Sequence, residues 1–174
     1  IYKKKDGTPV RKKFRKPPPA KRIKLINQAI QDAAALLAGK QRLLRKRDPA
    51  TMELFKKWFG RDDEKAVKII RTRIDKELKL MKSLNESHFI EIKDLETRQE
   101  TFALVYLDDP LHIISLGNPF WEAEAVGPDS RAGTLIHELS HYHDIGSTVD
   151  HEYGEMFCLA LAMDEPDNAL FNAD

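Results

Sequence analysis

The chain has 174 residues, of which 41% are apolar and 33% are charged, and its formal net charge is +1. This composition allows one buried core, and no run approaches the roughly 18 apolar residues of a membrane-spanning helix. The single cysteine, Cys158, excludes an internal disulfide framework, and its apolar surroundings predict a buried thiol instead of a nucleophile.

The charges of the chain are strongly segregated. Residues 1–82 hold 26 Lys and Arg against 9 Asp and Glu, whereas residues 83–174 hold 3 against 19. In one interpretation the two halves attract each other across a surface. In the other, the field of the acidic half favours a basic substrate. The sequence leaves both interpretations open.

Residues 1–22 contain ten Lys and Arg together with four prolines, a composition typical of an extended basic tail or linker. Such a tail could bind nucleic acid or an anionic membrane. It lacks interleaved aromatic residues, which favours a solvated linker. No signal peptide follows, and the start at Ile1 suggests a domain of a larger or processed protein. We expect residues 23–174 to form a single domain, helical over 23–84, with a sheet over 88–117 and catalytic helices over 130–174.

The first part of that domain shows a helical pattern. Apolar residues recur every three or four positions from residue 20 to about 47, and Asp48 and Pro49 interrupt them. Thr51 is then expected to cap a short helix that ends at Gly60. The acidic residues 62–64 open a long amphipathic helix that extends to about residue 81.

The period changes after Asn85, where three short strands are predicted within residues 89–92, 102–107 and 113–116, with a turn at 108–110. A loop over 117–129 leads to a helix from Arg131 to about His143, capped by Asp129 or Ser130. A final helix is expected from about Asp150 to Met163. This order of elements predicts an α+β fold.

The most informative motif lies on the helix predicted after residue 130, where residues 137–141 read H-E-L-S-H. His137 and His141 are four residues apart, so their imidazoles share one face of a helix and can bind one Zn²⁺. Glu138 then lies beside the open position of the metal, where a base for a water molecule is needed. His143 points away from this face and suits a solvated or supporting role. The motif predicts a zinc hydrolase, most directly a peptidase.

A third ligand must follow the two histidines. The candidates are Asp150, Glu152, Glu155 and Glu165. Asp150 is favoured because Gly146 lets the chain turn back, and its carboxylate would complete a His₂Asp set. The alternative role for Asp150 is to cap the final helix. A longer three-histidine motif is excluded, because Asp144 and Ser147 occupy the positions where it needs glycine and histidine.

Two segments carry a family resemblance. Residues 132–141 (A-G-T-L-I-H-E-L-S-H) and 147–154 (S-T-V-D-H-E-Y-G) resemble the two signatures of the aspzincin metalloendopeptidases, H-E-x-x-H and G-T-x-D-x-x-Y-G. This is the family of deuterolysins and peptidyl-Lys metallopeptidases, and the resemblance covers roughly residues 100–174. It implies a zincin-like metalloprotease domain. The one departure is Ser147, where the family usually has glycine, and we expect it to affect the ligand geometry little.

The resemblance implies a role for each matching residue. His137, His141 and Asp150 would bind one catalytic Zn²⁺, Glu138 would act as the general base, and Tyr153 would donate a hydrogen bond to the developing oxyanion. Spacing alone places Tyr153 about one helical turn after Asp150, which leaves a phenol packed in the core as an equal alternative.

The last three residues, N-A-D at 172–174, resemble the opening of the N-A-D-x-x-E element of the lysine-specific members. There the two acids form a pocket for a substrate lysine on the leaving-group side of the scissile bond. The resemblance therefore implies that Asp174 is a substrate-binding residue.

We therefore expect a zinc metalloendopeptidase that acts on proteins or peptides, prefers lysine after the scissile bond, and binds no nucleic acid. It would be secreted or delivered within a larger protein, as a toxin or effector domain with a cognate inhibitor or immunity protein. The alternative is a basic nucleic-acid- or surface-binding module on a catalytically degenerate metalloprotease fold, which would bind no zinc.

Overall fold

The computed structural model describes residues 19–174 and has an α+β fold, with helices first, a small sheet next and helices again at the end. The predicted fold class and order of elements are confirmed. Most of the predicted basic tail lies outside the described residues. Within residues 19–174, no helix is long and apolar enough to span a membrane.

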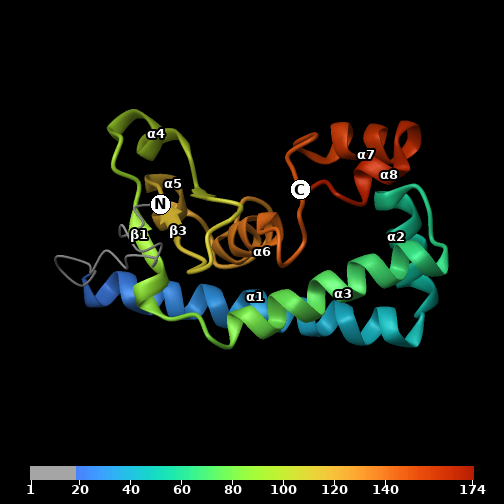
Figure 1. Ribbon diagram of the computed structural model, residues 1–174, viewed down its shortest axis with the longest axis horizontal. Coiled ribbons are helices and arrows are strands. Elements are labelled where there is room, and N and C mark those ends of the chain that lie inside the picture. The colour runs from blue at the N-terminus through green and yellow to red at the C-terminus, as the bar shows by residue number, and fades with distance from the viewer. Residues whose placement is uncertain (1–18) are drawn as a thin grey trace, which may run out of the picture.

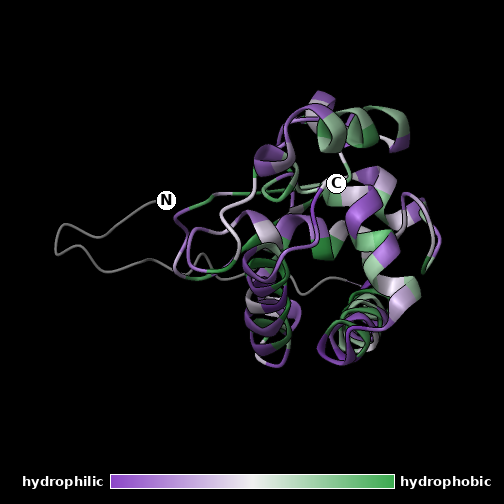
Figure 2. Ribbon diagram, turned by 90° about the vertical axis from the view of Figure 1, so that its right-hand side faces the viewer, coloured by the Kyte–Doolittle hydropathy of each residue, from purple (hydrophilic) through white to green (hydrophobic). Residues whose placement is uncertain are grey.

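Three helices form the base of the molecule: α1 (Ala20–Lys46), α2 (Pro49–Phe59) and α3 (Glu64–Met81). Figure 1 shows α3 running back beside α1 along the lower side. Their apolar faces are buried in the core, through Ile26 and Ala33 of α1 and Val67 and Ile74 of α3. The hydropathy colouring of Figure 2 shows hydrophobic and hydrophilic residues alternating along these helices, as expected for helices with one buried side.

The predicted cap of the short helix α2 is wrong. The helix begins at Pro49, and the Asp48 side chain accepts a hydrogen bond from the Thr51 backbone N–H at 3.0 Å. Aspartate is a strong N-cap, and proline favours the first helical position because its φ is already set. Gly60 ends α2 with φ 68°, as predicted. A Cβ there would lie 1.8 Å from the carbonyl oxygen of Ala162, so the glycine also allows a close approach to the C-terminal helices.

The sheet has the strand order β1-β3-β2, with β1 (Phe89–Glu91), β2 (Ala103–Val105) and β3 (Ile114–Leu116). β1 is parallel to β3, with Phe89 opposite Ile114, and β2 is antiparallel to β3, with Ala103 opposite Leu116. A 3₁₀ turn, η1 (Glu86–His88), precedes β1. The three predicted strands are confirmed, although the observed ones are shorter.

Three short helices were not predicted: α4 (Leu95–Glu100), α5 (Asn118–Glu122) and α8 (Pro166–Ala169). The second lies in the segment predicted as a loop. Each is too short to show a helical period, and each starts through local chemistry. Asp94 caps α4 by accepting from the Thr97 N–H at 2.9 Å, and a proline stands at the start of α5 and of α8.

The helix α6 (Arg131–His141) carries the H-E-x-x-H motif. Of the two predicted caps, Asp129 and Ser130, it is Ser130 that caps the helix, by accepting from the Gly133 N–H at 3.1 Å. Its apolar side is fully buried through Leu135 and Leu139, and α6 contacts both α1 and α3. The long helices α1 and α3 therefore pack against the helix that carries the motif.

The last long helix, α7 (Glu155–Asp164), starts five residues later than predicted. Residues 150–153 are not helical, and Gly154 precedes the helix with φ 79°, a conformation that no helix contains. Together, α7 and α8 pack against α2, at the opposite end of the molecule from the sheet, and the C-terminus lies between them and α6 (Figure 1).

The basic first half and the acidic second half are joined by ion pairs at the surface. Within residues 19–174 these pairs are Arg22–Glu91, Arg61–Asp167 and Lys57–Glu155. All three are partly exposed, so each contributes little to stability. They support the interpretation that the two halves attract each other.

Candidate metal centre

The two histidines of α6 are brought to the same point by the helix, as their spacing predicted. The Nε2 atoms of His137 and His141 are 3.1 Å apart. The Nδ1 atom of His141 is 2.9 Å from the Thr148 carbonyl oxygen. Because a carbonyl can only accept, this nitrogen carries the proton, and the lone pair of a neutral His141 is on Nε2. A hydrogen bond of this kind is the usual support of a metal-binding imidazole.

A tight turn after α6 reverses the chain. The Tyr142 carbonyl oxygen accepts from the N–H groups of residues 145, 146 and 147, at 2.9, 3.0 and 3.1 Å. Gly146 is required because a Cβ there would lie 2.4 Å from the Ser140 carbonyl oxygen. The Thr148 N–H then donates to this same oxygen at 3.2 Å. The turn returns the chain to the open side of α6.

Ser147 lies within this turn and has φ 53°, in the left-handed region that favours glycine. It is also the position at which the sequence departs from the aspzincin signature. Its hydroxyl donates to the His143 carbonyl oxygen at 3.0 Å, which supports the turn. Serine therefore holds the conformation that glycine adopts more readily.

Asp150 follows this turn, and its carboxylate completes a cluster. Its Oδ1 lies 3.2 Å from Nε2 of His137 and 3.4 Å from Nε2 of His141. Tetrahedral zinc with ligands at about 2.0–2.1 Å places its ligand atoms roughly 3.3 Å apart. The three distances, 3.1, 3.2 and 3.4 Å, match that requirement. The donor set, two imidazoles and one carboxylate, also suits zinc.

The competing assignments find no support in the structure. Among the described residues, the metal-ligand cluster comprises His137, His141 and Asp150 alone, without Glu152, Glu155 or Glu165. Asp150 does not cap α7, whose N-cap is Gly154. His143 is half-exposed and its Nδ1 lies 2.6 Å from Oδ1 of Asp108, away from the cluster, as predicted.

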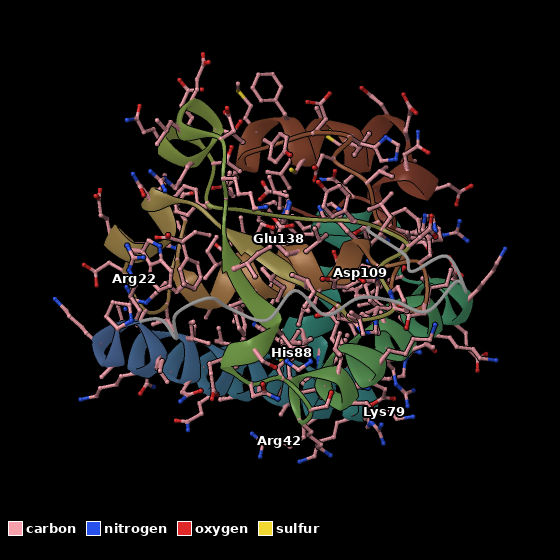
Figure 3. The ribbon with its side chains drawn as sticks, turned by 60° about the vertical axis from the view of Figure 1, so that its left-hand side comes forward. Arg22, Arg42, Lys79, His88, Asp109 and Glu138 are labelled. Atoms are coloured by element: carbon pink, nitrogen blue, oxygen red, sulfur yellow. The ribbon has the colours of Figure 1, made fainter. Side chains whose placement is uncertain are left out.

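Glu138 lies between the two histidines in sequence and is only 6% exposed. Figure 3 shows it in the interior, between the base helices and the upper part of the molecule, whereas Arg42 and Lys79 lie at the lower edge of the view. Burial, together with the nearby charge of Asp150, raises the pKa of Glu138 to about 8. Burial also lowers the pKa of His137, which favours the neutral imidazole that a metal binds.

Tyr153 lies beside the cluster, although a helix does not place it there. Its ring stacks over that of His137 with centroids 6.1 Å apart, and its hydroxyl hydrogen-bonds to Asp150. Burial, this hydrogen bond and nearby carboxylates hold the pKa of Tyr153 well above its ordinary value, so the phenol keeps its proton. The residue is 58% exposed, so the alternative of a phenol packed in the core is wrong.

Asp174 also reaches the site from the C-terminus. Its Oδ2 accepts from the Gly154 N–H at 2.7 Å. Its negative charge is close enough to raise the pKa values of both His137 and Tyr153, although burial lowers the pKa of His137 overall. Cys158 is buried, as predicted, with its Sγ 3.5 Å from the Glu152 carbonyl oxygen.

Sequence reasoning missed two supporting residues, Thr148 and Asn172. Thr148 accepts the hydrogen bond of His141 through its carbonyl, and Asn172 hydrogen-bonds the backbone just after Asp150. Both belong to segments that carry the family resemblance, so the signal was present. Their roles depend on backbone contacts, which spacing does not reveal.

Comparison with known proteins agrees with this geometry. The family model of the aspzincins, described as lysine-specific metallo-endopeptidase, matches residues 44–174. An extracellular protease of Aeromonas hydrophila is 34% identical over 146 residues, which cover 84% of this chain and 40% of that protein. A peptidyl-Lys metalloendopeptidase of Grifola frondosa is 44% identical over 78 residues, which cover 45% of this chain and 22% of that protein.

The solved structure of a zinc peptidase from Grifola frondosa superposes with a TM-score of 0.75 at 28% identity, covering 90% of this chain and 91% of that one. The matches to the two relatives above span less than half of the length of those proteins. All of these proteins are peptidases, so the comparisons do not favour a nucleic-acid-binding module on a degenerate fold.

Proposed function

Because this chain belongs to the aspzincin family of lysine-specific metallo-endopeptidases, we propose that it is a zinc-dependent endopeptidase that hydrolyses internal peptide bonds of proteins. The observation that carries the proposal is the three-ligand cluster, whose atoms are 3.1–3.4 Å apart beside a buried carboxyl group. His137, His141 and Asp150 would hold the metal. When bound, zinc supplies Lewis acidity, which polarises a carbonyl group and makes a water molecule more acidic.

Glu138 is the base in the proposed mechanism. Its carboxylate takes a proton from the attacking water molecule and delivers it to the nitrogen of the leaving amine. Burial and the charge of Asp150 raise the pKa of Glu138 to about 8 in the metal-free protein, so this carboxyl group accepts a proton readily. A divalent cation nearby would favour the ionised form needed for the first step.

Tyr153 is the proposed donor to the oxyanion that develops on the substrate carbonyl. Its hydroxyl stays protonated and is oriented by Asp150. A donor held in place before the reaction stabilises the transition state more than the substrate, because negative charge develops only as the bond forms.

We further propose that the enzyme prefers lysine after the scissile bond, with Asp174 contacting the lysine ammonium group. Asp174 is exposed, and its charge acts on His137 and Tyr153, so it lies at the edge of the site. The name of the Grifola frondosa relative, a peptidyl-Lys metalloendopeptidase, and the acidic balance of residues 83–174 support the same preference.

The cellular context is also a proposal. The relative from Aeromonas hydrophila is described as an extracellular protease, which supports a secreted enzyme. A toxin or effector role, with an inhibitor or immunity protein as partner, stays a prediction from the sequence alone.

Metal analysis and peptide cleavage test the proposed chemistry together. Wild type should bind one equivalent of zinc, lose activity with a chelator and regain it with added zinc. Glu138→Gln should keep the zinc and lose about 10²–10⁴-fold in kcat. Glu152→Gln, which changes an exposed carboxylate nearby, is the matched control and should stay near wild type. Full turnover by Glu138→Gln would refute its role as the base.

Matched peptides with lysine, arginine or norleucine after the scissile bond test the specificity. Asp174→Asn should lower kcat/KM for the lysine peptide by roughly 10–100-fold, because a charge-assisted hydrogen bond is lost, and change the norleucine peptide little. Asp164→Asn, at an exposed position of α7, is the control. An unchanged preference in Asp174→Asn would contradict the assignment.

A further inference from the structure

The loop of residues 147–154, called the ligand loop below, carries two residues of the proposed site without regular structure of its own. Asp150 and Tyr153 both belong to it, and several of its side chains are exposed. A metal site needs its ligands held within a fraction of an ångström, and an isolated loop does not provide this rigidity. Something outside the loop must therefore fix its backbone.

Asn172 makes the required contacts with a buried side chain that is 6% exposed. Its Oδ1 accepts from the His151 N–H at 2.9 Å and from the Glu152 N–H at 3.1 Å. Its Nδ2 donates to the Glu152 carbonyl oxygen at 3.0 Å. One carboxamide thus satisfies three backbone groups directly after Asp150 and just before Tyr153.

The C-terminal segment, residues 170–174, is also hydrogen-bonded to the rest of the protein on either side of Asn172. The Val149 N–H donates to the Phe171 carbonyl at 2.9 Å, and the Ala173 N–H donates to the Val149 carbonyl at 3.1 Å. The guanidinium of Arg73, on α3, donates to the Leu170 carbonyl at 2.7 Å. The segment is therefore connected to the base of the molecule as well as to the ligand loop.

We propose that Asn172 is a positioning residue of the metal centre: its carboxamide fixes the ligand loop so that Asp150 and Tyr153 are preorganised before metal or substrate arrives. This rests on the proposed function of the same site. Among the described residues, the side-chain hydrogen bonds of Asn172 go to backbone groups of the ligand loop and to Sγ of Cys158, so it would act on Asp150 and Tyr153 through the backbone. Supporting hydrogen bonds of this kind typically contribute 10–100-fold to metal affinity.

Three variants of the full chain separate this role from general stability. Asn172→Ala removes the three hydrogen bonds to the ligand loop and also the one from Nδ2 to Sγ of Cys158 at 3.4 Å. Asn172→Asp keeps an acceptor for the two N–H groups and loses the donor to Glu152. Asn168→Ala changes an asparagine on α8 whose side chain bonds only to Glu165 among the described residues, and is the matched control.

Two measurements follow: zinc affinity by competition with a chromophoric chelator, and amide hydrogen exchange of the metal-free protein. Asn172→Ala should bind zinc 10–100-fold more weakly, with faster exchange confined to residues 149–154. Asn172→Asp should recover part of both losses, and Asn168→Ala should match wild type. A merely structural role would instead raise exchange throughout the chain and would not be rescued selectively by aspartate.

A zinc affinity of Asn172→Ala within twofold of wild type, or unchanged exchange at residues 149–154, would overturn the proposal. If Asn172→Ala does not fold, Asn172→Asp decides: weaker zinc binding with faster local exchange supports the proposal, and wild-type behaviour overturns it. Wild-type protein that binds no zinc would refute the proposed function and this inference together. Wild type that binds zinc no more tightly than Asn172→Ala refutes the inference alone.

Discussion

Glu77 offers a quantitative test of the energetics of the buried core. It lies on α3, is 2% exposed, and its Oε2 has no hydrogen-bond partner among residues 19–174. Burial raises the pKa of Glu77 from its ordinary 4.5 to about 8, although the positive charge of Arg73 opposes the effect. The folded protein therefore holds this carboxyl in its neutral form at pH 7.

The sign of the effect on stability follows from proton binding. Between pH 4.5 and about 8, the folded state keeps the Glu77 proton and the unfolded chain releases it, so the free energy of unfolding falls as pH rises. The shift of about 3.5 pKa units corresponds to at most about 5 kcal/mol, since one unit is about 1.4 kcal/mol. Below this window both states are protonated, and above it both are ionised, so the contribution is constant on either side.

Glu77→Gln replaces the neutral carboxyl with a neutral amide of the same shape. The free energy of unfolding of the variant should equal that of wild type near pH 4 and exceed it by a growing margin up to about pH 8. Urea unfolding at several pH values measures both. The difference between the two proteins removes any pH dependence that they share. Asp75→Asn, which changes an exposed acid of the same helix, should show no such trend. A stability difference that stays constant with pH, or that shrinks as pH rises, would refute the reasoning.

Three further changes test the local structure. Ser147→Gly should raise the free energy of unfolding by about 0.5 kcal/mol, because glycine adopts the left-handed φ without strain and this gain exceeds the extra chain entropy that glycine loses on folding. Ser147→Ala keeps the strain, so it should be less stable than Ser147→Gly in thermal unfolding. Gly146→Ala should lower the free energy of unfolding by about 1–3 kcal/mol and weaken zinc binding, because the added Cβ would lie 2.4 Å from a backbone oxygen. Chemical denaturation and metal titration measure the two effects, and wild-type values in both would contradict the steric argument. Asp48→Ala should lower the free energy of unfolding by about 1 kcal/mol, because α2 loses its N-cap hydrogen bond. An unchanged denaturation midpoint would show that the cap contributes nothing to stability.

The long elements could be predicted from the sequence because their patterns repeat over many residues. The period of α1 and α3 extends over several turns, and the capping serine of α6 directly precedes its pattern. The short helices α4, α5 and α8 start from a single capping aspartate or a proline, signals that also occur in turns. Local chemistry of this kind specifies where a helix can begin and not whether it forms.

The candidate site was predicted residue by residue, but part of the geometrical reasoning was wrong. The i, i+4 spacing correctly brought His137 and His141 together on α6. Asp150 and Tyr153 were expected on one helix, whereas both lie on a loop. That loop is fixed by Asn172, which lies about twenty residues away in sequence and acts through backbone hydrogen bonds. Periodicity contains no information on such contacts.

The helix α1 has a practical consequence for anyone who divides this chain. The family match begins at residue 44, within the last turn of α1, yet Ile26, Ala29 and Ala33 of the same helix are almost completely buried and α1 contacts α6. An expression fragment cut at the start of the match would uncover the apolar side of the helix that presents His137 and His141. A fragment that keeps α6 covered therefore begins near residue 20, about two dozen residues before the boundary that sequence similarity marks.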